Sequence, residues 1–220
     1  MRDRPCVIYM PSAPSDQIMF YPHGVVAPER REYRDLSQVD DLSLDACNDA
    51  LDDLCASILS PPPGQFGSVR LWANASAYEP VQLAEKAIQG YVRTMLLGRY
   101  PGLIPVEEQI TDAGRLDVGI VSPRRTAPGY IGVLELKVLR SSSNESQLTE
   151  GIKQAASYQS HVESDWAQVC CFDMRPYTAP QLPTENNVQH ATRRSVSIRH
   201  WRLEPTAQAV RDREDEGSSV

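Results

Sequence analysis

The sequence predicts an α/β fold, in which helices flank a mixed central sheet. Segments with helical apolar periodicity alternate with shorter strand-like segments, an order that is typical of a sheet covered by helices. The helical segments span 42–59, 79–100 and 148–162. The strand-like segments span 104–110, 115–121, 130–139, 166–174 and 193–203. At 220 residues and 41% hydrophobic content, the chain is long enough to bury one good core.

Local signals place the ends of these elements. Residues 1–40 are rich in proline and polar residues and predict an irregular or partly extended arm. PPPGQFG predicts a loop after the first helix, Pro80 fits the first turn of the second helix, and a Pro-Gly pair follows its end. TDAG, between two strand-like runs, predicts a hairpin turn. We expect an arm and helix of unknown role over 1–60, an α/β domain over 61–205, and a charged disordered tail over 206–220.

Composition excludes several classes of function. The net charge of −7 excludes binding to nucleic acid by bulk charge, so such a role needs local basic patches. The sequence lacks the GxSxG, Walker, GxGxxG and HExxH motifs, which argues against a serine hydrolase or a nucleotide-dependent motor. The five cysteines have no zinc-ligand spacing and are expected to be reduced core residues.

Hydropathy argues against a membrane location. No run approaches the roughly 18 apolar residues of a spanning helix, and the N-terminus lacks the apolar region of a signal peptide. We therefore expect a cytoplasmic protein that does not act on membranes, and we leave open a nuclear location or delivery as an effector.

The run GVLELKVL places Glu135 and Lys137 in the middle of a strand that is otherwise apolar on both faces. With a period of two residues, both charged side chains lie on the same face of that strand. Isolated buried charges are costly, so the pair is either a structural ion pair or part of a functional site.

Two further carboxylates lie in marked positions. Asp117 interrupts the apolar strand RLDVGIV, and it can converge with Glu135 if the two strands are neighbours. Glu85 falls on the apolar stripe of the 79–100 helix, whereas Glu79 is explained by the dipole at the start of that helix. Carboxylates that share a half-buried site repel one another unless a cation neutralises them, and Mg²⁺ prefers such oxygen ligands.

The last element is QAASY, in which Gln154 and Tyr158 are one helical turn apart. Taken in order, Glu85, Asp117, Glu135-Leu-Lys137 and Gln154-xxx-Tyr158 resemble the PD-(D/E)xK nuclease superfamily. The match covers roughly residues 79–175, with helix, hairpin, ExK strand and helix in the order of that family. QxxxY is similar to the element of its RecB-like branch, and Leu116–Asp117 stands where the family motif has Pro-Asp.

The resemblance implies a restriction-endonuclease-like fold over 61–205 and metal-assisted hydrolysis of a phosphodiester. Asp117, Glu135 and the Leu136 carbonyl would hold Mg²⁺ or Mn²⁺, and Glu85 would support that ion or a second one. Lys137 would position the attacking water, while Gln154 and Tyr158 would orient the site or touch the phosphate. Arg115, Arg140 and Lys153 would contact nearby phosphates, although they could equally be ordinary surface charges.

Family analogy favours DNA over RNA as the substrate, and a defence, toxin or mobile-element context. Three alternatives stay open. One is a non-catalytic module of the same fold that binds nucleic acid or a protein, and another is a nuclease that cleaves RNA. The third is a structural ion-pair core with no nuclease role. A protein partner or a second copy of the chain is also compatible with the sequence.

Overall fold

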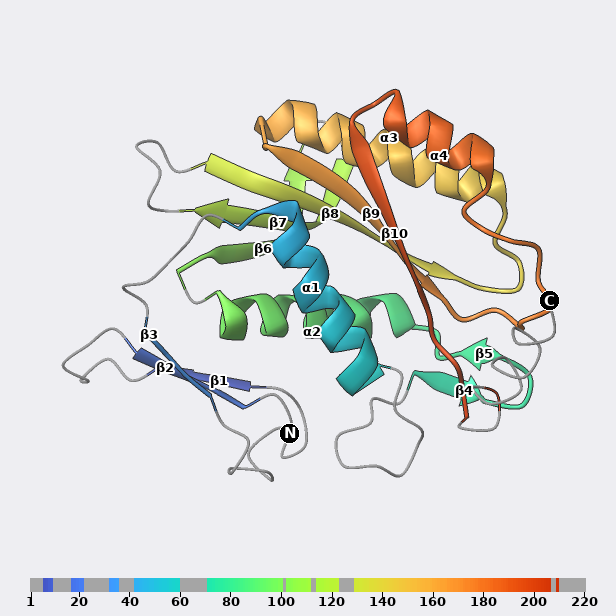
Figure 1. The fold of residues 1–220 in the computed structure, drawn as a ribbon, viewed down its shortest axis with the longest axis horizontal. Coiled ribbons are helices and arrows are strands. Elements are labelled where there is room, and N and C mark those ends of the chain that lie inside the picture. Colours follow the sequence, from blue (N-terminus) through green and yellow to red (C-terminus); the bar gives the residue numbers. More distant parts are fainter. Residues whose placement is uncertain are drawn as a thin grey trace.

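A mixed five-stranded sheet lies at the centre of the protein (Figure 1). The computed structural model describes the backbone of 6–9, 17–21, 32–35, 107–111 and 114, and residues 42–59, 71–100, 102–106, 115–122, 129–206 and 209. The strand order is β10-β9-β8-β7-β6. The strands are β6 (Ile104–Thr111), β7 (Gly114–Ser122), β8 (Gly129–Leu139), β9 (Trp166–Asp173) and β10 (Val196–Arg202). β8, β9 and β10 run parallel, whereas β7 is antiparallel both to β8 and to β6, with which it forms a hairpin.

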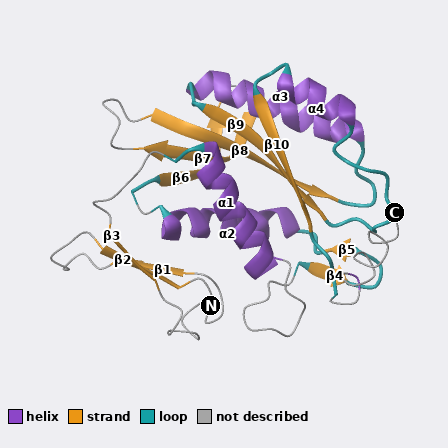
Figure 2. Cartoon of the chain, viewed as in Figure 1, coloured by secondary structure: helices purple, strands orange, loops and turns teal. Residues whose placement is uncertain are grey.

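Helices cover both faces of this sheet (Figure 2). One face carries α1 (Leu44–Leu54), which continues into a π-helical turn η2 (Cys55–Leu59), and α2 (Ala84–Arg99). The other face carries α3 (Glu145–Val162) and α4 (Glu185–Thr192). Each face has its own hydrophobic cluster, and parallel strands require such cover on both sides. The predicted α/β class with a mixed, helix-flanked sheet is confirmed.

β8 is the central strand, as the run GVLELKVL predicts. Its apolar residues divide between the two clusters, so both of its faces are buried. The α2-side cluster takes Ile131, Leu134, Leu136 and Val138, and the α3-side cluster takes Val133 and Leu139. Ile131 therefore departs from the expected alternation, beside a register shift between Ile120 and Val121 of β7.

The start of α2 differs from the prediction. Glu79 and Pro80 form the short strand β5 (Glu79–Pro80), which pairs with β4 (Trp72–Asn74), and the Val81 amide donates to the Leu71 carbonyl. The helix therefore begins at Ala84, and Glu85 rather than Glu79 lies in its first turn. A carboxylate there is also favoured by the helix dipole.

Polar caps define the helices on the opposite face. Asn144 and Gln147 form a capping box, so α3 begins three residues earlier than its apolar pattern. Thr184 caps α4, which lies between two predicted strand-like segments and is not among the predicted helices. The helix ENNVQHAT has few apolar residues. It is anchored instead by the Asn187 amide, which donates to α3 at the Glu145 carbonyl and the Thr149 hydroxyl.

The N-terminal arm contains a small antiparallel sheet. It consists of β1 (Cys6–Tyr9), β2 (Gln17–Tyr21) and β3 (Glu32–Asp35), in that spatial order. After it, α1 packs into the same hydrophobic cluster as α2, and Asp52 of α1 accepts hydrogen bonds from Arg199 and Trp201 of β10. The expected boundary near residue 60 thus lies between helices that share one core.

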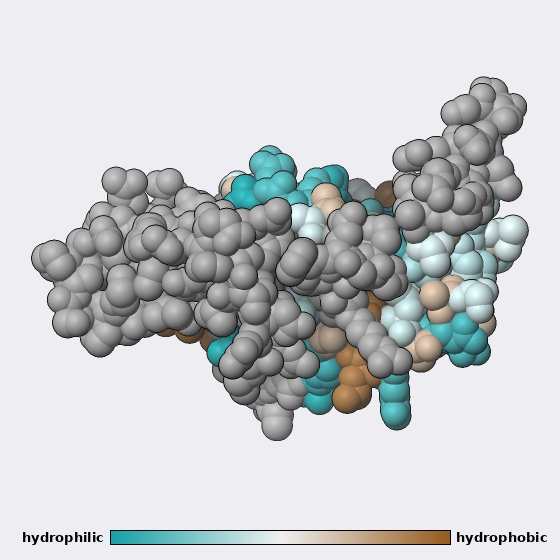
Figure 3. All heavy atoms as spheres, turned by 90° about the horizontal axis from the view of Figure 1, so that it is seen from below, coloured by the Kyte–Doolittle hydropathy of each residue, from teal (hydrophilic) through white to brown (hydrophobic). Residues whose placement is uncertain are grey.

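Several expectations fall on other parts of the chain. The predicted loop 61–67 and nearly all of the tail 206–220 lie outside the described residues. The four cysteines at 47, 55, 170 and 171 are free and buried, as expected of reduced core residues. Among the described residues, no helix is long and apolar enough to cross a membrane. On the face in Figure 3, the described residues show hydrophilic and hydrophobic side chains intermixed.

Candidate active site

The candidate site begins where two neighbouring strands separate. β7 and β8 remain paired as far as Val118 and Leu134, after which β7 continues beside β6 and β8 beside β9. Side chains replace the missing strand partner. The Leu136 amide donates to Asp117 Oδ2 at 2.9 Å, and the Val138 amide donates more weakly to Glu85 Oε2 at 3.4 Å. Two carboxylates thus line the open edge of the second half of β8.

Asp117 is held in place by Gln89, a residue that the sequence pattern alone does not mark as part of the site. The buried Gln89 of α2 donates from Nε2 to the Asp117 carbonyl at 2.6 Å, and its Oε1 accepts from Lys86. Gln89 lies one helical turn after Glu85, so both side chains reach the same strand edge. The spacing of four residues from Glu85 is the feature of the sequence that points to Gln89. It identifies Gln89 only after Glu85 is known to face the strand edge.

Glu135 and Lys137 form an ion pair on the α3 side of β8. Lys137 Nζ lies 2.7 Å from Glu135 Oε1, and the Glu135 side chain is only 4% exposed. Glu135 Oε2 is buried and has no hydrogen-bond partner within the part of the chain that the structure describes. Burial, and then repulsion from Asp117, raise the pKa of Glu135 to about 7 despite the nearby ammonium group.

The other two ionisable groups respond to the same surroundings. Burial raises the pKa of Asp117, although the Leu136 amide and Lys137 oppose the shift. Burial alone would lower the pKa of Lys137, but its ion pair with Glu135 outweighs this and raises the pKa. Lys137 is therefore a charged ammonium group beside carboxylates that resist ionisation.

Helix α3 holds the lysine from the other side. Gln154 Oε1 accepts from Lys137 Nζ at 3.2 Å. The lysine arm crosses α3 at Gly151, where an added Cβ would lie 2.8 Å from Lys137 Cε. Gly151 therefore provides the space in which the lysine arm lies.

Tyr158 supports the site from one turn further along α3. It is buried at 2% exposure, and its hydroxyl donates to the Arg115 carbonyl of β7 at 2.7 Å. Arg115 is two residues before Asp117, so this bond anchors the strand that carries the carboxylate. Burial raises the pKa of Tyr158. Its geometry suits an orienting role.

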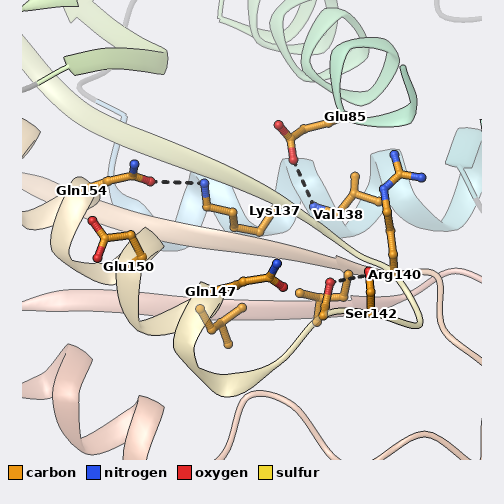
Figure 4. A pocket seen from close by; sticks show the side chains of 11 residues that line it. Glu85, Lys137, Val138, Arg140, Ser142, Gln147, Glu150 and Gln154 are labelled. Atoms are coloured by element: carbon orange, nitrogen blue, oxygen red, sulfur yellow. Dashed lines mark hydrogen bonds between the residues drawn. The ribbon is translucent and has the colours of Figure 1, made fainter. Parts of the chain in front are cut away.

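A cleft of about 380 Å³ opens at the end of β8 (Figure 4). Glu85 enters it from α2, whereas Gln147, Glu150 and Gln154 enter it from α3, and Lys137 points toward Gln154 (Figure 4). Arg140 also lines the cleft, and its guanidinium donates to the Val81 and Gln82 carbonyls beside the start of α2.

The predicted residues are thus largely brought together. Glu85, Asp117, Glu135, Lys137 and Gln154 surround the second half of β8, while Tyr158 and Arg115 lie at the adjoining strand. Lys153 is exposed, pairs with Glu150 and is not among the residues that line the cleft. No group of three or more His, Cys, Asp or Glu side chains is arranged as metal ligands within the described residues. In comparisons with known proteins, no family model, curated protein or solved structure matches this chain.

Proposed function

We propose that the protein is a divalent-metal-dependent nuclease of the PD-(D/E)xK type, with a restriction-endonuclease-like fold and DNA as its substrate. The observation that carries this proposal is the buried Oε2 of Glu135, which has no hydrogen-bond partner among the described residues and lies beside a second carboxylate, Asp117. An unmet acceptor in the interior costs about 1–3 kcal/mol. A cation bound between the two carboxylates would satisfy this oxygen and would offset the repulsion between Glu135 and Asp117.

The donor set fits Mg²⁺ or Mn²⁺. The charged groups that shift the pKa of Glu135 are the carboxylates of Asp117 and Glu85 and the ammonium group of Lys137, so carboxylates outnumber cations around this residue. Mg²⁺ commonly takes one or two protein carboxylates and keeps several waters, so it does not need three acidic ligands. The N–H and C=O of one strand residue face the same edge, so the Leu136 carbonyl lies on the edge that Asp117 lines.

Asp117, Glu135 and the Leu136 carbonyl would hold this ion, with Glu85 in support. The ion would supply positive charge to offset the phosphate and to activate a water for attack. Side chains of the protein would supply the charge stabilisation and the positioning. Lys137, oriented by Glu135 and Gln154, would stabilise negative charge that develops on the phosphate. Gln89 and Tyr158 keep the carboxylate strand in position.

Local cations would have to attract the substrate, because the chain carries a net charge of −7. Arg140 lines the cleft and is the best-placed phosphate contact, and Arg115 lies beside the same site. The preference for DNA over RNA, and any role in defence, toxicity or mobile elements, rests on the family resemblance.

A second candidate function is a non-catalytic module that binds nucleic acid or a protein. The observation that favours it is the Glu135–Lys137 ion pair, in which the lysine already neutralises one carboxylate oxygen. Such a module would retain affinity for its partner without divalent ions.

Cleavage assays separate these functions. Plasmid, single-stranded DNA and RNA are incubated with the protein, with Mg²⁺, with Mn²⁺ or with chelator. Wild type is compared with Glu135→Gln, Lys137→Met and the matched surface control Glu185→Gln. We expect metal-dependent cutting of DNA by wild type and the control, and a loss of at least a hundredfold in both site variants. Folded site variants that cut as fast as wild type would overturn the proposal, and binding without cutting would favour the second candidate.

A further inference from the structure

A second cleft, of about 460 Å³, opens at the carboxyl ends of β9 and β10. Its lining includes Asp173 at the end of β9, His200 and Arg202 near the end of β10, and Arg175, Tyr177 and Gln181 from the loop that leads to α4. β8, β9 and β10 are parallel, so the ends of all three strands lie at one edge of the sheet. The first cleft, lined by Leu139 and Arg140, opens at the same edge.

Both clefts also lie on the same side of the sheet. Ile198 packs against the α3-side cluster, and side chains alternate along a strand, so His200 and Arg202 also face the α3 side. Lys137 and Gln154 meet on that side. β8 and β10 are two strand spacings apart, or about 10 Å. An extended strand of a few nucleotides would span the two clefts.

A buried carboxylate organises the second cleft. Asp173 is 1% exposed and accepts from Arg175 Nε and Nη2 at 2.9 and 2.7 Å. His200 Nε2 and Arg202 Nη1 lie 3.1 and 3.2 Å from its Oδ2. Burial alone would raise the pKa of Asp173, but the hydrogen bonds from Arg175 and His200 outweigh it and hold the pKa below its usual range. Asp173 is therefore an ionised anchor for three nitrogen-rich side chains.

A second buried carboxylate pairs with Arg202 behind the cleft. Glu204, which accepts from Arg202 Nε at 3.0 Å, is buried and does not line the cleft. The Arg202 guanidinium donates to Glu204 and to the Arg175 carbonyl, and its Nη1 forms an ion pair with Asp173. A guanidinium has five N–H groups, so these three contacts with described residues leave up to two N–H groups for a ligand. The exposed surface of the cleft adds the His200 ring, the Tyr177 hydroxyl and the Gln181 amide.

We propose that this second cleft binds a backbone phosphodiester of the nucleic acid whose scissile bond lies in the first cleft, with Arg202 and His200 as its main contacts. The two arginines offset the two buried carboxylates, so binding in this cleft would depend on oriented N–H and O–H donors rather than on net positive charge. Such donors match the oxygens of a phosphodiester. The inference rests on the proposed nuclease function.

Binding is tested without cleavage, by fluorescence anisotropy of a labelled 20-nucleotide DNA in chelator. The variants are Arg202→Gln and, because Arg202 is largely buried and its loss could unfold the protein, the exposed His200→Ala. The control is Arg199→Gln, which removes a charge from the next residue of β10 but on the opposite face, where Arg199 pairs with Asp52. Circular dichroism verifies that each variant is folded.

We expect a fivefold to tenfold loss of affinity in each folded cleft variant, and an unchanged affinity in the control. Arg202→Gln should also make the plot of log K against log salt concentration less steep, by about the slope that one phosphate contact contributes. In Mg²⁺, KM should rise while kcat stays within twofold, because the chemistry takes place in the first cleft. If wild type binds and cuts DNA but both cleft variants bind as tightly, the second site is overturned and the nuclease proposal stands. If wild type neither binds nor cuts DNA, both proposals fall.

Discussion

Replacing Gly151 by alanine should separate the stability of the protein from its activity. Gly151 lies within α3, where glycine is about 1 kcal/mol less favourable than alanine. The structural reason for this glycine is Lys137, whose Cε would lie 2.8 Å from an added Cβ. The obstructing atom belongs to a flexible side chain rather than to backbone, so the helix accepts the methyl group and the lysine moves.

The size of that movement follows from the contact. Ordinary van der Waals contact begins near 3.4 Å, so Lys137 Cε must retreat by about 0.6 Å or more. The ammonium nitrogen is bonded to this carbon, so its contacts with Glu135 at 2.7 Å and Gln154 at 3.2 Å are disturbed together. Misplacement of a catalytic group by about 1 Å can cost 10²-fold, so we expect kcat to fall roughly 10- to 100-fold.

The matched control is Gly90→Ala in α2, where an added Cβ would have no atom of the described residues within 4 Å. Differential scanning calorimetry and metal-dependent DNA cleavage are measured for both variants. Gly90→Ala should raise the melting temperature by about 2–4 °C and cleave like wild type. Gly151→Ala should melt no lower than wild type, yet cleave slowly. The reasoning fails if Gly151→Ala cleaves at the wild-type rate, or if it unfolds well below wild type.

Three further predictions concern the groups around the lysine. The folded protein raises the pKa of Glu135 from 4.5 to about 7, so it keeps a proton that the unfolded chain loses. Urea unfolding of the metal-free protein should therefore show a loss of up to about 3 kcal/mol between pH 4.5 and 7, and Glu135→Gln or added Mg²⁺ should flatten this loss. Gln89→Leu removes the donor to the Asp117 carbonyl and should lower the free energy of unfolding by about 1–2 kcal/mol. Calorimetry should also show weaker Mg²⁺ binding. An unchanged metal affinity would contradict the positioning role of Gln89. Tyr158→Phe removes the hydrogen bond to the Arg115 carbonyl and should lower the free energy of unfolding by about 1 kcal/mol. It should slow cleavage less than tenfold. Abolished cleavage in a stable variant would mean that the hydroxyl touches substrate.

The fold was predictable where local pattern and burial agree. The period of two in GVLELKVL, with apolar residues on both faces, predicts a covered central strand, and β8 is that strand. Prediction failed where distant contacts decide. α4 depends on Asn187 reaching α3, and α2 starts late because Glu79 and Pro80 pair with a strand that precedes them. Neither contact leaves a periodic pattern in the segment that it stabilises.

The candidate site was predictable as a set of residues, but not as an arrangement. Charged residues on apolar positions single out Glu85, Asp117, Glu135 and Lys137. Gln89 could not be predicted in the same way, because a neutral polar residue is common on the exposed side of a helix. Its role becomes clear only from its hydrogen bond to the Asp117 carbonyl. The separation of β7 from β8 likewise depends on pairing between strands, which the sequence of either strand does not encode.

That separation gives the site two built-in spectroscopic reporters. The amide protons of Leu136 and Val138 would point at backbone carbonyls in a continuous sheet, but here they point at the carboxylates of Asp117 and Glu85. Their nuclear magnetic resonance frequencies should follow the ionisation of those side chains and respond to any cation that the carboxylates bind. The amides of Leu136 and Val138, which are neighbours of Glu135 and Lys137 in the same strand, therefore report the charge state of the site.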